Sequence, residues 1–272
     1  MPIILLIIII LIILFVLLGI KFQAKRNRER LKAATFNPAW VLILQKNLAL
    51  YNKLPDTLKR KLHGLINVFV HEKTFSGYNG LQINDEIKVT IASQACMLLL
   101  NRDDDIYPSL HNIFVYPSAF KSMQTTSDGM LETIEETVRI GESWQLGRVV
   151  LSWHHSKQGA MDEADGQNVV YHEFAHQLDH EDGAIDGTPV LYSAENYEQW
   201  TQVFSQEYTR LRQKVYANKN TLIDAYGAVS EGEFFAVVTE LFFERPQLLE
   251  KEHPELYEAL RNFYCLNPLE WF

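Results

Sequence analysis

The sequence predicts an α+β fold in which a small β-sheet is set among helices, with one transmembrane helix in front of it. Three observations support this prediction. The chain of 272 residues opens with an uninterrupted apolar run. Helical apolar spacing recurs on both sides of the centre, and the central segments are rich in β-branched and aromatic residues.

The apolar run extends from Pro2 to Ile20. Its length is close to the roughly 20 residues that a helix needs to cross the hydrocarbon of a membrane. Basic residues follow at once, with only one acidic residue among them: Lys21, Lys25, Arg26, Arg28, Arg30 and Lys32. A cleaved signal peptide would carry its positive charge before the run. We therefore expect residues 1–22 to remain as a transmembrane anchor.

The basic flank also predicts an orientation, because Lys and Arg beside a transmembrane segment favour the cytoplasmic side. We expect a single-pass protein of the inner (cytoplasmic) membrane, held there through residues 2–20, with its body in the cytoplasm. Residues 23–36 are interpreted as a basic juxtamembrane linker. Residues 37–272 are interpreted as one domain with a helical N-terminal part, since no second linker divides them.

The composition argues against nucleic acid as a partner. The formal net charge is −9, whereas phosphate binding needs clustered positive charge. Cys96 and Cys265 lie in apolar stretches. They are expected to pack in the core rather than to form a disulfide or bind a metal.

The domain begins with helical patterns and then changes character. Apolar residues recur every three or four positions over 37–73 and again over 86–100. The segments that follow are bounded by Gly, Pro and Ser, and they predict strands over 111–117, 135–143 and 147–153. His154 and His155 come directly after the last strand. Neighbouring strand residues point to opposite sides, so we interpret these histidines as surface residues rather than joint metal ligands.

Helical spacing returns in the second half of the chain. It predicts helices over 168–183, 196–218, 231–246 and 253–264. The first of these is expected to stop at Gly183 and the third at Pro246, because glycine and proline are typical of helix ends.

The stretch from His172 to His176 reads His-Glu-Phe-Ala-His, which has the pattern H-E-x-x-H on a predicted helix. Positions i and i+4 share one helix face, so both imidazoles can bind a single Zn²⁺ ion. Glu173 can then face the attacking water and act as its general base. A zinc ion would acidify that water and polarise a scissile carbonyl, which predicts hydrolysis.

The third zinc ligand is less obvious, although a catalytic zinc ion generally takes three protein ligands. His180 continues the same straight helix and lies too far along it to share the ion with His172. Glu233 and Glu240 stand on one stripe of an apolar helix, where a buried carboxylate needs a cation or hydrogen-bond donors. Spacing alone does not choose between them. Asp179 is expected to bond a neighbouring group or to orient a ligand histidine.

Several stretches resemble the Mlc titration factor A family of zinc metallopeptidases. They are ESWQLGRVVLSW, NVVYHEFAHQLD, IDAYGA and GEFFAVVTELFF. The likeness continues upstream through VHEKTFSGYNGL, IASQACMLLLN and IFVYPSAF. It therefore covers residues 37–268, which is nearly all of the predicted domain.

The resemblance implies a zincin fold of the gluzincin type, like the catalytic domain of anthrax lethal factor. It also implies one catalytic Zn²⁺ ion, held by His172, His176 and Glu233, with Glu173 as general base. The family's active-site tyrosine falls on Tyr226, whose hydroxyl could donate to the oxyanion that develops during hydrolysis. Glu240 then becomes a carboxylate behind the ligands, bonded to a histidine.

Two functions are compatible with this sequence. The first is a zinc-dependent peptidase acting on a peptide or protein substrate, with aminopeptidase-like activity as one form of it. The resemblance implies a regulatory role, in which the glucose phosphotransferase system is modulated through the repressor Mlc. The alternative is a membrane-tethered protein that titrates a transcriptional repressor, with little physiological proteolysis. The strand over 147–153 is either an edge strand that pairs with extended peptide or an internal strand.

Overall fold

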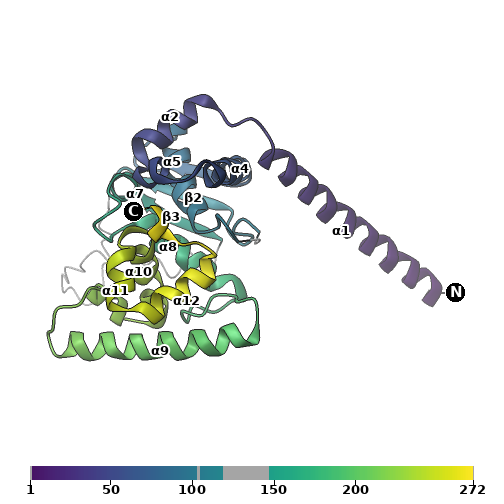
Figure 1. The fold of residues 1–272 in the computed structure, drawn as a ribbon. Coiled ribbons are helices and arrows are strands. Elements are labelled where there is room, and N and C mark those ends of the chain that lie inside the picture. The colour runs from purple at the N-terminus through teal and green to yellow at the C-terminus, as the bar shows by residue number, and fades with distance from the viewer. Residues whose placement is uncertain (1, 103–104, 119–146, 272) are drawn as a thin grey trace, which may run out of the picture.

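The computed structural model describes residues 2–102, 105–118 and 147–271 (Figure 1). This part of the chain is mostly helical and contains one small sheet. The N-terminal helices are α1 (Pro2–Lys32), α2 (Pro38–Asn47), α3 (Ala49–Lys53), α4 (Asp56–Glu72) and α5 (Asp85–Met97). Helix α4 packs against both α1 and α5. The helices predicted over 37–73 and 86–100 are therefore confirmed.

Asparagine side chains fix the starts of two of these helices. The Oδ1 atom of Asn37 accepts the N–H of Ala39 at the start of α2, and that of Asn84 accepts the N–H of Ile87 at the start of α5, both at 3.0 Å. These bonds satisfy backbone donors that the helix itself leaves without acceptors. The apolar faces behind the caps then meet in the core.

The sheet contains three parallel strands in the order β1-β2-β3. They are β1 (Thr74–Gly77), β2 (Asn112–Tyr116) and β3 (Arg148–Ser152). One face of the sheet is buried through Ile113, Val115, Val149 and Leu151. The strands predicted over 111–117 and 147–153 are confirmed, whereas the segment 135–143 lies outside the described residues. Strand β1 was not predicted, because it follows α4 without a turn signal.

The second half of the described chain is helical. Its elements are α7 (Trp153–Met161), α8 (Val169–Asp179), the 3-10 helix η1 (His180–Asp182), α9 (Ala194–Tyr216), the 3-10 helix η2 (Ala225–Ala228), α10 (Glu231–Glu244), α11 (Pro246–Glu252), α12 (Pro254–Tyr264) and the 3-10 helix η3 (Pro268–Trp271). The long helix α9 runs along one side of the body (Figure 1). Helix α10 packs against α8, η2 and α11.

Helix α10 is the most deeply buried element around the site. Every residue from Phe234 to Glu244 is buried, most of them in an apolar core. Aromatic rings from α9 and α12 close over it: the ring of Trp200 stacks on that of Phe204 with centroids 3.8 Å apart, and Phe235 meets Phe263 at 5.7 Å. A carboxylate on this helix therefore has little water to solvate it and needs partners from the protein.

The prediction of an α+β fold, with a zincin-like sheet and a transmembrane helix, is wrong as stated. The described chain is mostly helical, and its strands are only four or five residues long. Residues 153–161, which follow the last strand, form a further helix. Short strands of this kind align a few side chains at the core, while the helices provide most of the packing.

The predicted transmembrane anchor over 1–22 is also wrong. Within residues 2–102, 105–118 and 147–271, no helix is both long and apolar enough for a membrane span. The apolar run does not end at a linker, because α1 continues through the basic residues to Lys32. Its basic end packs on the body, where Arg28 pairs with Glu72 at 2.7 Å. The single-pass location in the inner membrane rested on that span and is overturned with it.

Candidate metal centre

Helix α8 places two histidines one turn apart at the start of the site. Its first turn is fixed by Asn168, whose Oδ1 accepts the N–H groups of Val170 and Tyr171, both at 3.1 Å. The rings of His172 and His176 consequently point to the same side, with centroids 4.9 Å apart. The H-E-x-x-H spacing thus produces the shared face that the sequence predicts.

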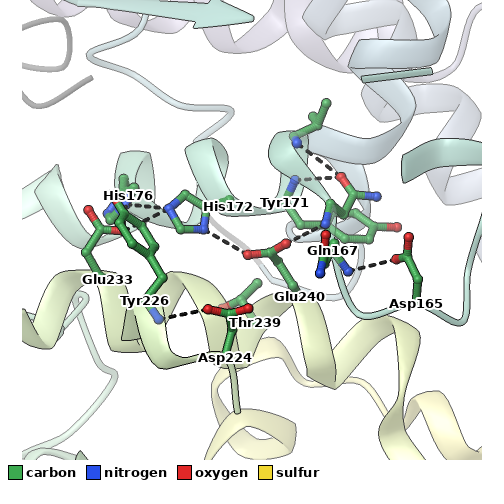
Figure 2. Close-up of polar contacts among 12 residues, drawn as sticks. Asp165, Gln167, Tyr171, His172, His176, Asp224, Tyr226, Glu233, Thr239 and Glu240 are labelled. Atoms are coloured by element: carbon green, nitrogen blue, oxygen red, sulfur yellow. Dashed lines mark hydrogen bonds and ion pairs between the residues drawn. The ribbon is translucent and has the colours of Figure 1, made fainter. Parts of the chain in front are cut away.

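Helix α10 brings a carboxylate to these rings from a distant part of the sequence. Ser230 caps the helix by accepting the N–H of Glu233 at 3.2 Å. The Oε2 atom of Glu233 lies 2.9 Å from Nε2 of His172 and 3.4 Å from Nε2 of His176. The two Nε2 atoms are 3.3 Å apart. Figure 2 shows the three side chains converging from the two helices.

These three atoms form a triangle that fits a tetrahedral metal ion. Zinc binds imidazole nitrogen and carboxylate oxygen at about 2.0–2.2 Å, so two ligand atoms of one tetrahedral site lie roughly 3.3 Å apart. The observed edges of 2.9, 3.3 and 3.4 Å match that spacing. In the described part of the chain, His172, His176 and Glu233 are the group of side chains that could hold an ion. Three protein ligands would leave one further position on a tetrahedral ion.

Opposite charges meet at the triangle. Burial lowers the pKa of His172, but the hydrogen bonds that it donates to Glu233 and Glu240 outweigh burial and raise the pKa to about 10. Burial raises the pKa of Glu233, but the two histidines outweigh it and lower the pKa to about 2. Burial lowers the pKa of His176. The site therefore attracts positive charge, which a proton or a metal ion can supply.

Glu240 lies on the other side of His172, behind the triangle. Its Oε1 atom is 2.8 Å from Nδ1 of His172, and its Oε2 atom accepts the backbone N–H of Asn168. Burial raises the pKa of Glu240. A carboxylate in this position accepts the Nδ1 proton, which leaves Nε2 free to bind a metal. The structure thus separates the two glutamates that spacing alone could not distinguish.

Glu173 and Tyr226 lie beside the triangle. Glu173 is only 1% exposed and follows His172 on α8. The ring of Tyr226 lies 6.0 Å from that of His172, on a short 3-10 helix that begins where Asp224 accepts the N–H of Tyr226 at 2.8 Å. Burial and the nearby Glu233 raise the pKa of Tyr226 to about 12. Its hydroxyl therefore stays protonated and can donate a hydrogen bond.

Asp179 ends α8 and holds the loop that follows. Its Oδ2 atom accepts the backbone N–H of Gly187 at 2.9 Å. Burial raises the pKa of Asp179 to about 7. The same loop packs tightly against the start of α10, since a Cβ atom on Gly187 would lie 2.5 Å from the carbonyl oxygen of Glu231. Asp179 thus connects α8 to the helix that carries Glu233.

A cavity of about 430 Å³ adjoins the triangle. It is lined by His172, Glu173 and Tyr226 on one part of its wall and by residues of α7 and the 165–169 loop on another. Cavities of roughly 300–1,000 Å³ are typical of ligand sites. The prediction that His154 and His155 lie at the surface is confirmed, since both are exposed. His155 also lines this cavity, which the sequence did not predict. Ser152 in fact caps a helix that contains both histidines.

Two further residues of the site were not singled out from the sequence. Asn168 caps α8, bonds Glu240 through its backbone and donates from Nδ2 to Glu244 at 2.9 Å. Asp224 caps the turn that presents Tyr226. Both positions carry a recognisable signal, because Asn and Asp are preferred directly before a helix. Their contacts across the site, however, depend on the packing of separate helices.

Comparison with known proteins agrees with this geometry. The family model for glucose-regulated metallo-peptidase M90 matches residues 22–265. The chain is 44% identical over 234 residues to uncharacterized protein slr2042 of Synechocystis sp., covering 85% of each chain. It is 29% identical over 221 residues to Mlc titration factor A of Klebsiella pneumoniae, covering 80% of this chain and 82% of that protein. The corresponding Escherichia coli protein is 28% identical over 228 residues, with 82% and 85% covered.

The resemblance to the Mlc titration factor A family that the sequence predicts is therefore confirmed. The matched region contains both helices of the triangle and the turn with Tyr226. The chain belongs to the glucose-regulated metallo-peptidase M90 family.

Proposed function

We propose that this protein is a zinc-dependent peptidase whose ion is held by His172, His176 and Glu233. Membership of a metallopeptidase family implies a metal ion and a peptide or protein substrate. The observation that carries the proposal is the triangle of Nε2, Nε2 and Oε2 atoms with edges of 2.9–3.4 Å. Two imidazoles and one carboxylate form a ligand set that suits zinc and leaves an open position.

Glu173 is proposed as the general base. When bound, zinc supplies Lewis acidity, which polarises the scissile carbonyl and lowers the pKa of a water molecule. Glu173 adjoins a ligand histidine and lines the cavity. It can take the proton of the attacking water and pass it to the leaving nitrogen of the peptide. A buried carboxylate is suited to this step because no bulk water competes for the proton.

Tyr226 is proposed as the donor that stabilises the oxyanion. Its phenol stays protonated over the physiological range, because its pKa is raised to about 12. It lines the same cavity as Glu173. Donation from its hydroxyl to the carbonyl oxygen would strengthen as negative charge develops there. Glu240 is proposed to orient His172, and Asp179 to hold the loop that fixes the start of α10.

The decisive experiment replaces Glu173 by Gln in the full chain. Glu173→Gln should keep one zinc ion per chain and lose hydrolysis of a quenched fluorescent peptide library. The amide has nearly the same shape as the carboxylate but cannot take a proton. Peptide cleavage by the zinc-loaded variant at the wild-type rate would contradict the proposed mechanism.

The names of two relatives support a second function. Proteins 28–29% identical to this chain are named Mlc titration factor A. We propose binding of the repressor Mlc as an additional role, through which glucose uptake would be regulated. Glu173→Gln separates the two roles, since capture of purified Mlc by a variant without hydrolysis would show that binding does not need cleavage. Absence of Mlc binding by the wild-type chain would remove this second role alone.

A further inference from the structure

We infer that His155 contacts the substrate of the candidate active site, where its imidazole donates a hydrogen bond to a main-chain carbonyl oxygen of the bound peptide. The inference rests on the proposed peptidase function, because it assigns a role in the same cavity. It adds a residue from α7, an element that contributes nothing to the metal triangle.

The cavity extends from a candidate metal ligand to α7. Its volume of about 430 Å³ joins the face of His172, Glu173 and Tyr226 to the side chain of His155. A peptide that presents its scissile bond to Glu173 and extends along the cavity would therefore reach α7. A polar side chain of α7 that lines this wall, as His155 does, can contact such a peptide.

The imidazole of His155 is oriented by Ser152. Ser152 Oγ accepts the backbone N–H of His155 at 3.4 Å and lies 3.0 Å from Nδ1 of the same residue. The hydroxyl proton of Ser152 can be donated to Nδ1. A ring bonded in this way carries its proton on Nε2, the nitrogen that faces away from Ser152, and can donate it to a ligand.

Few of the described side chains that line the cavity can donate a hydrogen bond. The described residues that line it include four carboxylates but no Lys or Arg: Asp165, Glu173, Asp224 and Glu240. Carboxylates cannot donate to a peptide carbonyl. The amide of Asn168 already donates to Glu244, and Tyr226 is assigned to the oxyanion. Among the lining side chains, His155 and the amides of Gln158 and Gln167 remain as donors. Of these, His155 has its ring oriented by the contact of Nδ1 with Ser152.

The neighbouring histidine provides a matched control. His154 lies on the same turn of α7, and its ring centroid is 5.2 Å from that of His155. Both side chains are exposed. Only His155 is among the described residues that line the cavity. Replacing each in turn changes the same residue type on the same helix, and only one change reaches the substrate.

The first experiment measures binding without turnover. Calorimetry measures the binding of a peptide to the zinc-loaded Glu173→Gln chain. The peptide is one that the wild type cleaves. If the wild type cleaves none, the library peptide that binds most tightly is used. Adding His155→Ala should raise Kd about three- to tenfold, as expected for the loss of one hydrogen bond. Adding His155→Gln should restore most of the affinity, because Gln keeps a donor. Adding His154→Ala should leave Kd within twofold.

The second experiment measures catalysis in the wild-type background. His155→Ala should raise KM and leave kcat within about twofold, with unchanged zinc content and Tm. A structural role would instead lower Tm or zinc content, and it would not be rescued by Gln. Equal Kd and KM values for His155→Ala and His154→Ala would overturn the inference.

Failure of this inference is distinguishable from failure of the proposed function. If the zinc-loaded wild type cleaves peptides and His155→Ala behaves as His154→Ala does, the peptidase proposal stands and the role of His155 falls. If the wild type cleaves no peptide, the peptidase proposal falls. Calorimetry then still decides whether His155 contacts a bound peptide, since that measurement needs no turnover.

Discussion

His172 and Glu240 are joined across two helices by a hydrogen bond of 2.8 Å between Nδ1 and Oε1. The opposite nitrogen of the same ring lies 2.9 Å from Glu233. One imidazole therefore bridges two carboxylates on α10, with one acceptor on each side (Figure 2). This relationship assigns different tasks to Glu233 and Glu240, and it makes the tasks separable by mutation.

Zinc content should distinguish the two glutamates. Glu233→Ala should remove a ligand, so the purified variant should retain little zinc. Glu240→Gln should retain zinc with an affinity about 10–100-fold weaker, the usual cost of losing a carboxylate behind a ligand histidine. Metal analysis and competition with a chelator measure both effects. Near-normal zinc affinity after the loss of Glu233 would contradict the assignment.

Tyr226→Phe should lower the rate of the chemical step and leave the metal in place. Removing one oxyanion donor typically lowers kcat by about 10²–10³-fold. Because Tyr226 is 42% exposed, its ring should tolerate the loss of the hydroxyl without a change in fold. Steady-state kinetics and zinc analysis test this expectation. Tyr216→Phe is the control, since Tyr216 is 92% exposed at the end of α9. If Tyr226→Phe and this control have the same kcat, the proposed role of Tyr226 is excluded.

Gly187→Ala should weaken both the fold and the metal site. Gly187 has a φ of 76°, and an added Cβ atom would lie 2.5 Å from the carbonyl oxygen of Glu231, at the start of the helix that carries Glu233. The backbone strain of alanine at this φ and the displacement of Glu231 by the added Cβ atom should together lower the free energy of unfolding by roughly 2–4 kcal/mol. Urea unfolding and zinc titration measure the two effects.

Gly183→Ala is the matched control for this prediction. Gly183 also has a positive φ, of 96°, but nothing lies within 4 Å of an added Cβ atom. Gly183→Ala should therefore lower the free energy of unfolding by only about 1 kcal/mol, through backbone strain, and should keep normal zinc affinity. Equal losses in the two variants would show that the close contact with Glu231 has no role in holding the site.

The sequence predicted the local parts of this site well, because they depend on helix periodicity. The spacing of His172 and His176 on one face follows from 3.6 residues per turn and needs no knowledge of other elements. The triangle depends instead on how α10 packs against α8. Spacing therefore left Glu233 and Glu240 as equal candidates, and the family resemblance supplied a choice that the contacts now support.

The errors in the predicted fold also have physical causes. Pro246 was correctly expected to stop a helix, since α10 ends at Glu244. The same proline also opens α11, which the sequence did not predict, because proline suits the first turn of a helix. Residues 153–161 lack strong apolar spacing, so the helix α7 was not predicted. The apolar start of α1 satisfied the length rule for a membrane span, yet the helix continues into a basic end that pairs with the body through Arg28.

The pH dependence of stability should be altered by Glu244→Gln. Glu244 is 2% exposed, and burial raises its pKa from 4.5 to about 9. A carboxyl group whose pKa is raised in the folded state is protonated there, while the unfolded chain releases the proton above about pH 4.5. This difference in bound protons lowers the free energy of unfolding progressively as the pH rises from about 4.5 to 9. Below about pH 4.5 the carboxyl group is protonated in both states and has no such effect.

Glutamine removes the ionisation and keeps an oxygen that can accept from Asn168 Nδ2, as Oε1 of Glu244 does at 2.9 Å. The variant should therefore match the wild type near pH 4.5 and exceed it at pH 8 by about 1–3 kcal/mol in the free energy of unfolding. Urea unfolding at both pH values measures the difference. Glu198→Gln, on the exposed face of α9, should change neither value by more than about 0.5 kcal/mol. A Glu244→Gln variant that is less stable than the wild type at pH 8 would show that this carboxyl group is ionised in the fold and held by its neighbours.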